Sequence, residues 1–156
     1  MKLTANFTLD ELIKSQVAER KGINNNPSPE QIENLKALAV NILQPIRSHY
    51  NQALQISSGF RCAELCIAIG SSVNSQHVAD DNAAAADFEI WGKDNKEVAS
   101  FIKSELEFDQ LILEFHKKGE PNSGWVHCSY SRNQNRQQSL RAYREDGKVI
   151  YKPWLE

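Results

Sequence analysis

The sequence predicts an α+β domain in which a small, mostly antiparallel sheet has its helices packed on one face. Up to Asn51 the apolar residues recur at helical spacing, and beyond it short strand-like runs interleave with short helices. Helices followed by such strands are typical of the α+β class. A length of 156 residues suits one domain. We therefore expect a single domain over residues 1–156, with its core in about 28–131 and a C-terminal hairpin in 132–156.

The first helices are predicted from the residues that begin them. Residues 8–11, Thr-Leu-Asp-Glu, have the form of a capping box and lead into a helix over 11–20. Residues 28–31, Ser-Pro-Glu-Gln, begin the next helix, with serine as the cap and proline at the first position. Its apolar residues at helical spacing are Ile32, Leu35, Leu38, Ala39, Ile42 and Leu43. Pro45 lacks a backbone N–H, so we expect it to kink or end the regular part of this helix.

The rest of the chain is predicted to alternate strands with short helices and loops. Strands are expected in four runs, 54–60, 84–92, 109–115 and 125–131. Short helices are expected over 63–70 and 94–106, and polar loops over 71–83 and 116–124. In the C-terminal tail, Asp146 and Gly147 mark the turn of a hairpin.

Charge and cysteine content argue against several classes of protein. Eighteen basic and twenty acidic residues give a net charge of −2, which does not favour nucleic-acid binding. No apolar run reaches about 18 residues, so no membrane insertion is expected. Three cysteines do not make a disulfide framework. The N-terminal residues lack the apolar segment of a secretory signal, so we expect synthesis in the cytoplasm, and we expect a monomer.

Three predicted strands each place a polar side chain opposite their apolar residues, because side chains alternate between the faces of a strand. The predicted core face holds Phe88, Ile90, Leu111, Leu113, Phe115, Val126, Cys128 and Tyr130. Asp87, Glu114 and His127 then project from the other face, where the small Ala85 leaves room for a cleft. Taken singly, each of these polar residues is more often an ordinary exposed or hydrogen-bonded strand residue than part of a site.

Together with His77, in the loop before the Asp87 strand, these residues form a candidate zinc site. Two imidazoles and one carboxylate, from His77, Asp87 and His127, leave the fourth position of a tetrahedral zinc ion open for water, as catalytic zinc sites require. Glu114 is then available as a general base beside that water. Asp109 opens the Glu114 strand, where either a hydrogen bond that supports the site or a simple strand cap is expected.

Five short segments follow one another within residues 28–131. They are Ile-Ser-Ser-Gly-Phe-Arg at 56–61, Ser-Gln-His at 75–77, Ala-Ala-Asp-Phe at 85–88, Asp-Gln-Leu-Ile-Leu-Glu at 109–114 and Trp-Val-His at 125–127. As an ordered set they resemble the zinc peptidases of the M15 family, although any one alone is a weak signal. That family contains D-alanyl-D-alanine carboxypeptidases and related peptidoglycan peptidases, including phage endolysins.

This resemblance implies a small α+β fold of the Hedgehog/DD-peptidase type and a zinc-dependent peptidase. It implies that His77, Asp87 and His127 hold the Zn²⁺ ion. Arg61 would bind a substrate carboxylate or the scissile carbonyl oxygen, since its guanidinium group suits either. Ser75 is similar to a motif serine that forms a hydrogen bond in the substrate cleft.

The implied substrate is a peptidoglycan peptide that contains D-amino acids. A terminal D-alanyl-D-alanine bond and an L-alanyl-D-glutamate bond both stay open. Trp125 shares the face of His127, where it either walls the substrate cleft or packs against a neighbour. Because peptidoglycan lies outside the cytoplasm and no signal peptide is expected, a phage or prophage enzyme that reaches the cell wall after release would reconcile the two expectations.

Two departures from the family pattern stand out. His77 and Asp87 are ten positions apart instead of the usual seven, so Asp80 or Asp81 could compete as a ligand. Many relatives have an acidic residue three positions before the last histidine, where this chain has Gly124. These departures favour a second hypothesis, a catalytically silent zinc-containing module that binds cell-wall peptide or a protein partner. A third hypothesis is a structural protein that uses the fold as a scaffold.

Overall fold

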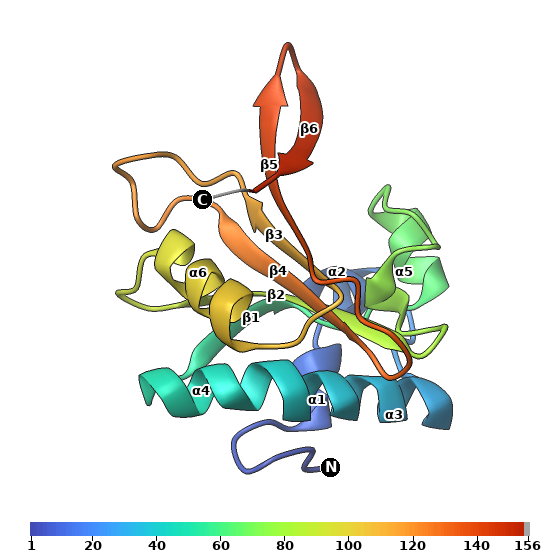
Figure 1. Ribbon diagram of the computed structural model, residues 1–156. Coiled ribbons are helices and arrows are strands. Elements are labelled where there is room, and N and C mark those ends of the chain that lie inside the picture. The colour runs from blue at the N-terminus through green and yellow to red at the C-terminus, as the bar shows by residue number, and fades with distance from the viewer. Residues whose placement is uncertain (155–156) are drawn as a thin grey trace.

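A six-stranded sheet forms the centre of the protein, whose computed structural model describes residues 1–154 (Figure 1). The strands are β1 (Leu54–Ser58), β2 (Ala83–Ile90), β3 (Gln110–Glu114), β4 (Trp125–Ser131), β5 (Gln138–Glu145) and β6 (Lys148–Pro153). Their order is β1-β2-β4-β3-β5-β6. Every neighbouring pair is antiparallel except β3 and β5. The prediction of an α+β fold with a mostly antiparallel sheet is confirmed.

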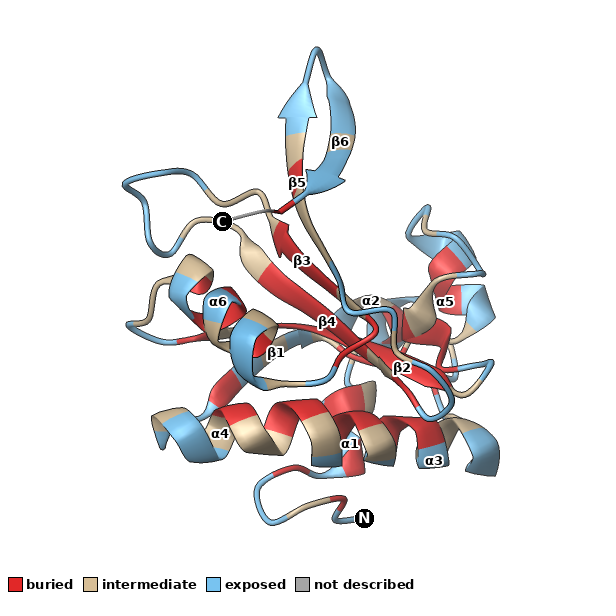
Figure 2. Ribbon diagram, in the orientation of Figure 1, coloured by how far each residue is buried: buried red, intermediate tan, exposed pale blue. Residues whose placement is uncertain are grey.

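The helices are α1 (Leu9–Ile13), α2 (Gln16–Lys21), α3 (Pro29–Leu38), the π-helical turn η1 (Ala39–Leu43), α4 (Gln44–Tyr50), α5 (Ala63–Ala68), the 3₁₀ turn η2 (Gln76–Val78) and α6 (Asn95–Glu105). The segment α3–η1–α4 forms one long rod beneath the sheet (Figure 1). The upper side of this rod, toward the sheet, is buried, while the lower side is largely exposed (Figure 2). No helix within residues 1–154 is long and apolar enough to cross a membrane.

The prediction of one continuous first helix is wrong, because the chain breaks between α1 and α2. Lys14 is extended, with ψ at 130°, and the Ser15 side chain accepts a hydrogen bond from the Ala18 N–H to begin α2. The carbonyl of Leu12 is used elsewhere, since it accepts a 2.7 Å hydrogen bond from the N–H of Phe60. A tertiary contact therefore takes the acceptor that a continuing helix needs. Thr8 does cap α1 as expected, through the Glu11 N–H.

Pro45 disturbs the long helix without ending it. The N–H of Gln44 bonds to the carbonyl of Ala39, five residues back, which is the spacing of a π-turn. Pro45 itself cannot donate a backbone hydrogen bond, so the irregular turn lies directly before it. The helix then continues as α4 to Tyr50.

The core lies between the sheet and the rod, with α6 packed on the same face. The alternation predicted for the strands is confirmed for the core residues Phe88, Ile90, Leu111, Leu113, Val126 and Cys128, and Tyr130 packs against them. Phe115 is the exception. β3 ends at Glu114, and Phe115 turns away with φ at 57°, so its ring packs 5.3 Å from the ring of Trp125.

A C-terminal hairpin turns at Asp146 and Gly147, as predicted, and extends the sheet through β5. Its two strands lie within 138–153, so residues 132–137, which the prediction included, precede it. Asp146 and Gly147 both have positive φ, at 51° and 76°, as a two-residue hairpin turn requires. The far end of the hairpin projects from the body of the protein and is largely exposed (Figures 1 and 2). The hairpin was expected over 132–156, of which residues 155–156 lie outside the described residues.

Candidate metal centre

Strand register brings the polar residues together on the sheet face that points away from the rod. Asp87 on β2 lies directly opposite His127 on β4, and His127 lies opposite Ile112 on β3. Glu114 lies opposite Trp125, two residues along β4 from His127. A cleft of about 480 Å³ opens over these residues, and Arg61, Ser75 and Tyr151 also line it.

His77 comes to this cleft from the loop before β2. Ser75 caps the short turn η2 by accepting a hydrogen bond from the His77 N–H. The Nδ1 of His77 lies 2.7 Å from the carbonyl oxygen of Gly59, an acceptor, so Nδ1 carries the proton. Nε2 is therefore the free nitrogen, and it lies 3.3 Å from Oδ1 of Asp87. A backbone carbonyl on the outer ring nitrogen is the usual support of a metal-binding histidine.

The Asp87 carboxylate is the centre of the cluster. Its Oδ1 lies 2.9 Å from Nδ1 of His127, and its Oδ2 lies 3.4 Å from Nη2 of Arg61. Burial raises the pKa of Asp87, but the hydrogen bond from His127 and the other interactions with the two histidines lower it more, so its pKa lies well below the ordinary value. For His77, burial lowers the pKa, which favours the neutral imidazole. A carboxylate and neutral imidazoles are the protonation states that metal ligands need.

The geometry of these three residues fits a zinc ion. One ligand atom from each of His77, Asp87 and His127 lies within 4.8 Å of the other two. Bonds of about 2.0–2.1 Å place neighbouring ligands of a tetrahedral zinc ion about 3.4 Å apart, so small side-chain movements would suffice. No other group in the described part of the chain has this arrangement of histidine, cysteine, aspartate or glutamate.

The longer spacing between His77 and Asp87 is absorbed by a tight loop. Ala79, Asp81 and Asn82 all have positive φ, and the carbonyl of Ala79 accepts a hydrogen bond from the buried Asn34. Asp80 accepts a hydrogen bond from Gln31 on α3, away from the cluster. Neither Asp80 nor Asp81 joins the group of candidate ligands.

A bulge in β1 sets the position of Arg61. The register between β1 and β2 shifts between Ile56 and Ser58, which places Ser58 opposite Asp87. The Nε of Arg61 donates to Oγ of Ser58 at 2.8 Å, and Nη1 donates to Oγ of Ser71 at 3.3 Å. With the contact to Asp87, these bonds use three of the five guanidinium N–H groups. Within residues 1–154 the other two N–H groups make no hydrogen bond, so they are available to a ligand in the cleft.

Glu114 lies on the same face, supported by Trp125. The indole Nε1–H of Trp125 donates to Oε2 of Glu114 at 2.6 Å. Burial raises the pKa of Glu114 and outweighs this hydrogen bond. A carboxylate with a raised pKa is suited to accept a proton near neutral pH.

Gly124 occupies its position because no side chain fits there. Its φ is 68°, and a Cβ atom on Gly124 would collide with the carbonyl oxygen of Glu114. An acidic residue three positions before His127 is therefore excluded in this structure. The same close contact brings the loop before β4 against the end of β3, beside Glu114.

Three supporting contacts were not predicted from the sequence. The Gly59 carbonyl that binds Nδ1 of His77 is a backbone group, so no residue type in the sequence marks it. The hydrogen bond from Arg61 to Ser58 depends on the bulge in β1. Tyr151 reaches the cleft only because the hairpin pairs with the sheet, in the row Glu114–Ala142–Tyr151.

Asp109 does more than cap a strand, because its Oδ2 accepts a 2.7 Å hydrogen bond from Gln76, the neighbour of His77.

Comparison with known proteins agrees with this geometry. The family model described as Peptidase M15 matches residues 5–129. This match begins well before residue 28, which is consistent with the hydrogen bond that ties Leu12 of α1 to Phe60 near the cleft. The comparison with curated proteins finds no match. Since the matched segment covers most of the chain and includes the His77, Asp87 and His127 cluster, this protein belongs to the peptidase M15 family.

Proposed function

We propose that this protein is a zinc-dependent peptidase that cleaves a peptide bond of bacterial peptidoglycan next to a D-amino acid. Membership of the peptidase M15 family implies a metallopeptidase. The observation that carries the zinc-dependent reaction is the convergence of His77, Asp87 and His127 within 4.8 Å, in a cleft that also contains Glu114. The choice of a peptidoglycan substrate follows from the resemblance to the M15 peptidases. His77, Asp87 and His127 would hold the zinc ion, which lowers the pKa of water toward neutrality and polarises a carbonyl group.

The protein's own residues would move the proton and stabilise charge. Glu114 accepts a proton from the attacking water as the oxygen bonds to the scissile carbonyl carbon. When the carbon–nitrogen bond breaks, Glu114 returns this proton to the leaving amine. The two free N–H groups of Arg61 hydrogen-bond either the developing oxyanion or a substrate carboxylate.

The cleft walls would position the peptide. Ser75 lines the cleft, and its hydroxyl can still donate while it accepts from the His77 N–H. Trp125 would contact the substrate with its ring while its N–H orients Glu114. The proposed substrate is the peptide part of peptidoglycan, bound by a single copy of the chain.

The test is cleavage of purified peptidoglycan by the zinc-loaded protein, followed as new amino groups and as free D-alanine. Release of D-alanine indicates a carboxypeptidase, and new amino groups without D-alanine indicate an endopeptidase. A chelator should abolish the reaction, and added zinc should restore it. Glu114→Gln should bind zinc but lose turnover, while Glu120→Gln on an exposed loop serves as the control.

The second candidate, a silent zinc-containing binding module, is favoured by Gly124 at the position where many relatives have an acid. This module would bind zinc and cell-wall peptide without releasing either product. If Glu114→Gln kept near-normal turnover with zinc bound, the assignment of the base to Glu114 would be wrong.

A further inference from the structure

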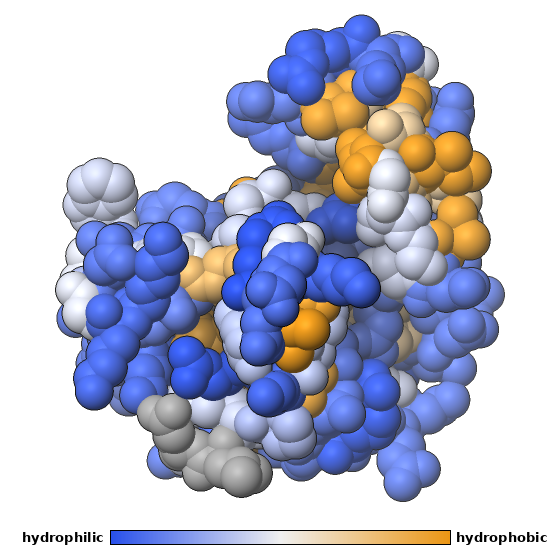
Figure 3. Space-filling model, turned by 90° about the horizontal axis from the view of Figure 1, so that it is seen from above, coloured by the Kyte–Doolittle hydropathy of each residue, from blue (hydrophilic) through white to orange (hydrophobic). Residues whose placement is uncertain are grey.

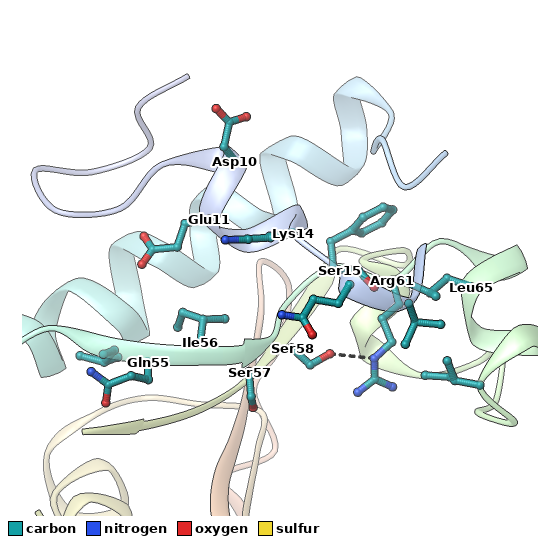
Figure 4. Close-up of a pocket in the computed structure, with 15 residues that line it drawn as sticks. Asp10, Glu11, Lys14, Ser15, Gln55, Ile56, Ser57, Ser58, Arg61 and Leu65 are labelled. Atoms are coloured by element: carbon teal, nitrogen blue, oxygen red, sulfur yellow. Dashed lines mark hydrogen bonds between the residues drawn. The ribbon is translucent and has the colours of Figure 1, made fainter. Parts of the chain in front are cut away.

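A second hollow of about 950 Å³ lies beside the cleft, between the outer edge of β1 and the segment α1–α2. Figure 4 shows β1 along one side, with Gln55 and Ser57 on the strand. Across from it lie Glu11 on α1 and Lys14 directly after that helix. This volume lies at the upper end of the range for ligand-binding pockets. We call it the β1 groove.

β1, the strand that borders the β1 groove, is an edge strand of the sheet. β1 pairs with β2 on one side, and no strand of the described residues pairs with its other side. Within residues 1–154, no backbone hydrogen bond joins Leu54–Ser58 to any element other than β2. An unpaired edge presents a row of backbone N–H and C=O groups, to which an extended peptide can add as a further strand.

Arg61 connects the β1 groove to the metal centre. Its side chain lines both hollows, and its guanidinium group contacts Asp87. Ser58 also lines the groove and holds Nε of Arg61, as the dashed line in Figure 4 shows. A chain that lies along β1 would therefore reach the proposed zinc ligands by passing Arg61.

The walls of the groove differ in chemistry. Glu11 and Lys14 line the side toward α1, whereas Leu65 and Ile69 line the end toward α5. Ile69 is 42% exposed, and Ile67 beside it is 70% exposed. Figure 3, seen from above, shows apolar residues gathered at the surface on the right, the side on which α5 lies in Figure 1. A peptide that lies along β1 would therefore meet charged side chains on the α1 side and aliphatic side chains at the α5 end.

We propose that the β1 groove binds the peptide substrate as a strand added to β1, and that the chain continues past Arg61 into the metal centre. This inference rests on the proposed function and deepens it. A groove outside the cleft has a role only if the substrate extends several residues from the scissile bond. The enzyme then prefers long wall peptides and intact peptidoglycan over a dipeptide.

The first experiment measures hydrogen exchange of the zinc-loaded Glu114→Gln protein with and without a peptidoglycan stem pentapeptide. Because this variant should not turn the peptide over, bound peptide stays intact. Strand addition predicts slower exchange at amides of Leu54–Ser58 when the peptide is present. Unchanged exchange in this segment at saturating peptide would overturn the proposal.

The second experiment compares substrates of increasing length in otherwise wild-type protein. Ile69→Arg removes an apolar wall of the groove, and Ile67→Arg is the control, because Ile67 lies nearby but does not line the groove. Losing about half the burial of one aliphatic side chain predicts that Ile69→Arg lowers kcat/KM about tenfold for the pentapeptide and not for D-alanyl-D-alanine. The proposal that the peptide binds in the β1 groove would be contradicted if the two variants lowered kcat/KM equally. It would also be contradicted if Ile69→Arg lowered kcat/KM equally for both substrates.

The outcomes separate this inference from the proposed function. Cleavage without protection of β1 refutes the groove and leaves the peptidase intact. Protection of β1 without cleavage refutes the peptidase and supports the groove as a peptide site. If β1 becomes protected without peptide as protein concentration rises, and sedimentation shows a dimer, the edge pairs with a second copy and the proposal fails.

Discussion

Replacing Gly124 by alanine tests how the loop before β4 fits against β3. The added Cβ would collide with the carbonyl oxygen of Glu114 and would lie 2.7 Å from the carbonyl carbon of Phe115 and 2.8 Å from the nitrogen of His116. All three neighbours are backbone atoms, so no side-chain rotation can relieve the contact. Either the loop or the end of β3 must move.

The expected cost has two parts. A left-handed backbone conformation costs an alanine about 1–2 kcal/mol relative to glycine. Forcing an extra methyl group into a packed site costs about 1–3 kcal/mol more. Together they predict a loss of about 2–5 kcal/mol in the free energy of unfolding. For a chain of this length, each kcal/mol lowers Tm by about 2–4 °C.

Gly119→Ala is the matched control. Gly119 also has a left-handed backbone, with φ at 83°, but a Cβ there would meet nothing within 4 Å. Thermal unfolding followed by circular dichroism should therefore show both variants less stable than the wild type, with Gly124→Ala lower by a further ~2–12 °C. If the two variants have the same Tm, the close approach of Gly124 to β3 is not present in the protein.

Three further changes give distinct results. Trp125→Phe removes the hydrogen bond that lowers the pKa of Glu114, so the acidic limb of the proposed pH–activity profile should move to higher pH; an unchanged limb would mean that Glu114 is not the base. His127→Ala should weaken zinc binding measured by competition with a chelator, whereas His49→Ala, outside the cleft, should not. Burial raises the pKa of Asp109, but the hydrogen bonds from Arg136 and Gln76 lower it more, so its folded pKa lies below the unfolded value. This stabilisation is present above the unfolded pKa of about 3.9 and is lost as the pH falls through the folded pKa. Asp109→Asn should therefore lower the free energy of unfolding at neutral pH. The difference between the variant and the wild type should shrink in acid, as measured by denaturant unfolding at a series of pH values.

Much of the fold could be predicted because its signals are local. The caps at Thr8 and Ser28 depend on a hydroxyl and an N–H three residues on, so they act wherever the helix later packs. The two-residue period of a strand placed Asp87 and His127 opposite the core side chains, and the hairpin turn at Asp146 followed from its residue types. These features need no knowledge of distant parts of the chain.

Other features were decided by contacts between distant segments. The first helix breaks because Phe60 takes the carbonyl of Leu12, 48 positions earlier in the chain. Gly124 faces the backbone of β3, and only this contact shows why an acid is missing there.

In the candidate metal centre, too, the residue types could be predicted from the sequence, but their arrangement in space could not. Residue types and spacing were enough to propose His77, Asp87 and His127, because imidazole and carboxylate are the donors that zinc binds. Their convergence depends on the register of β2 with β4 and on the Gly59 carbonyl that orients His77. The free edge of β1 that borders the β1 groove depends on strand order, since a strand has a free edge only when nothing pairs beside it. Register and strand order are properties of the assembled sheet, so no local pattern in the chain could have revealed them.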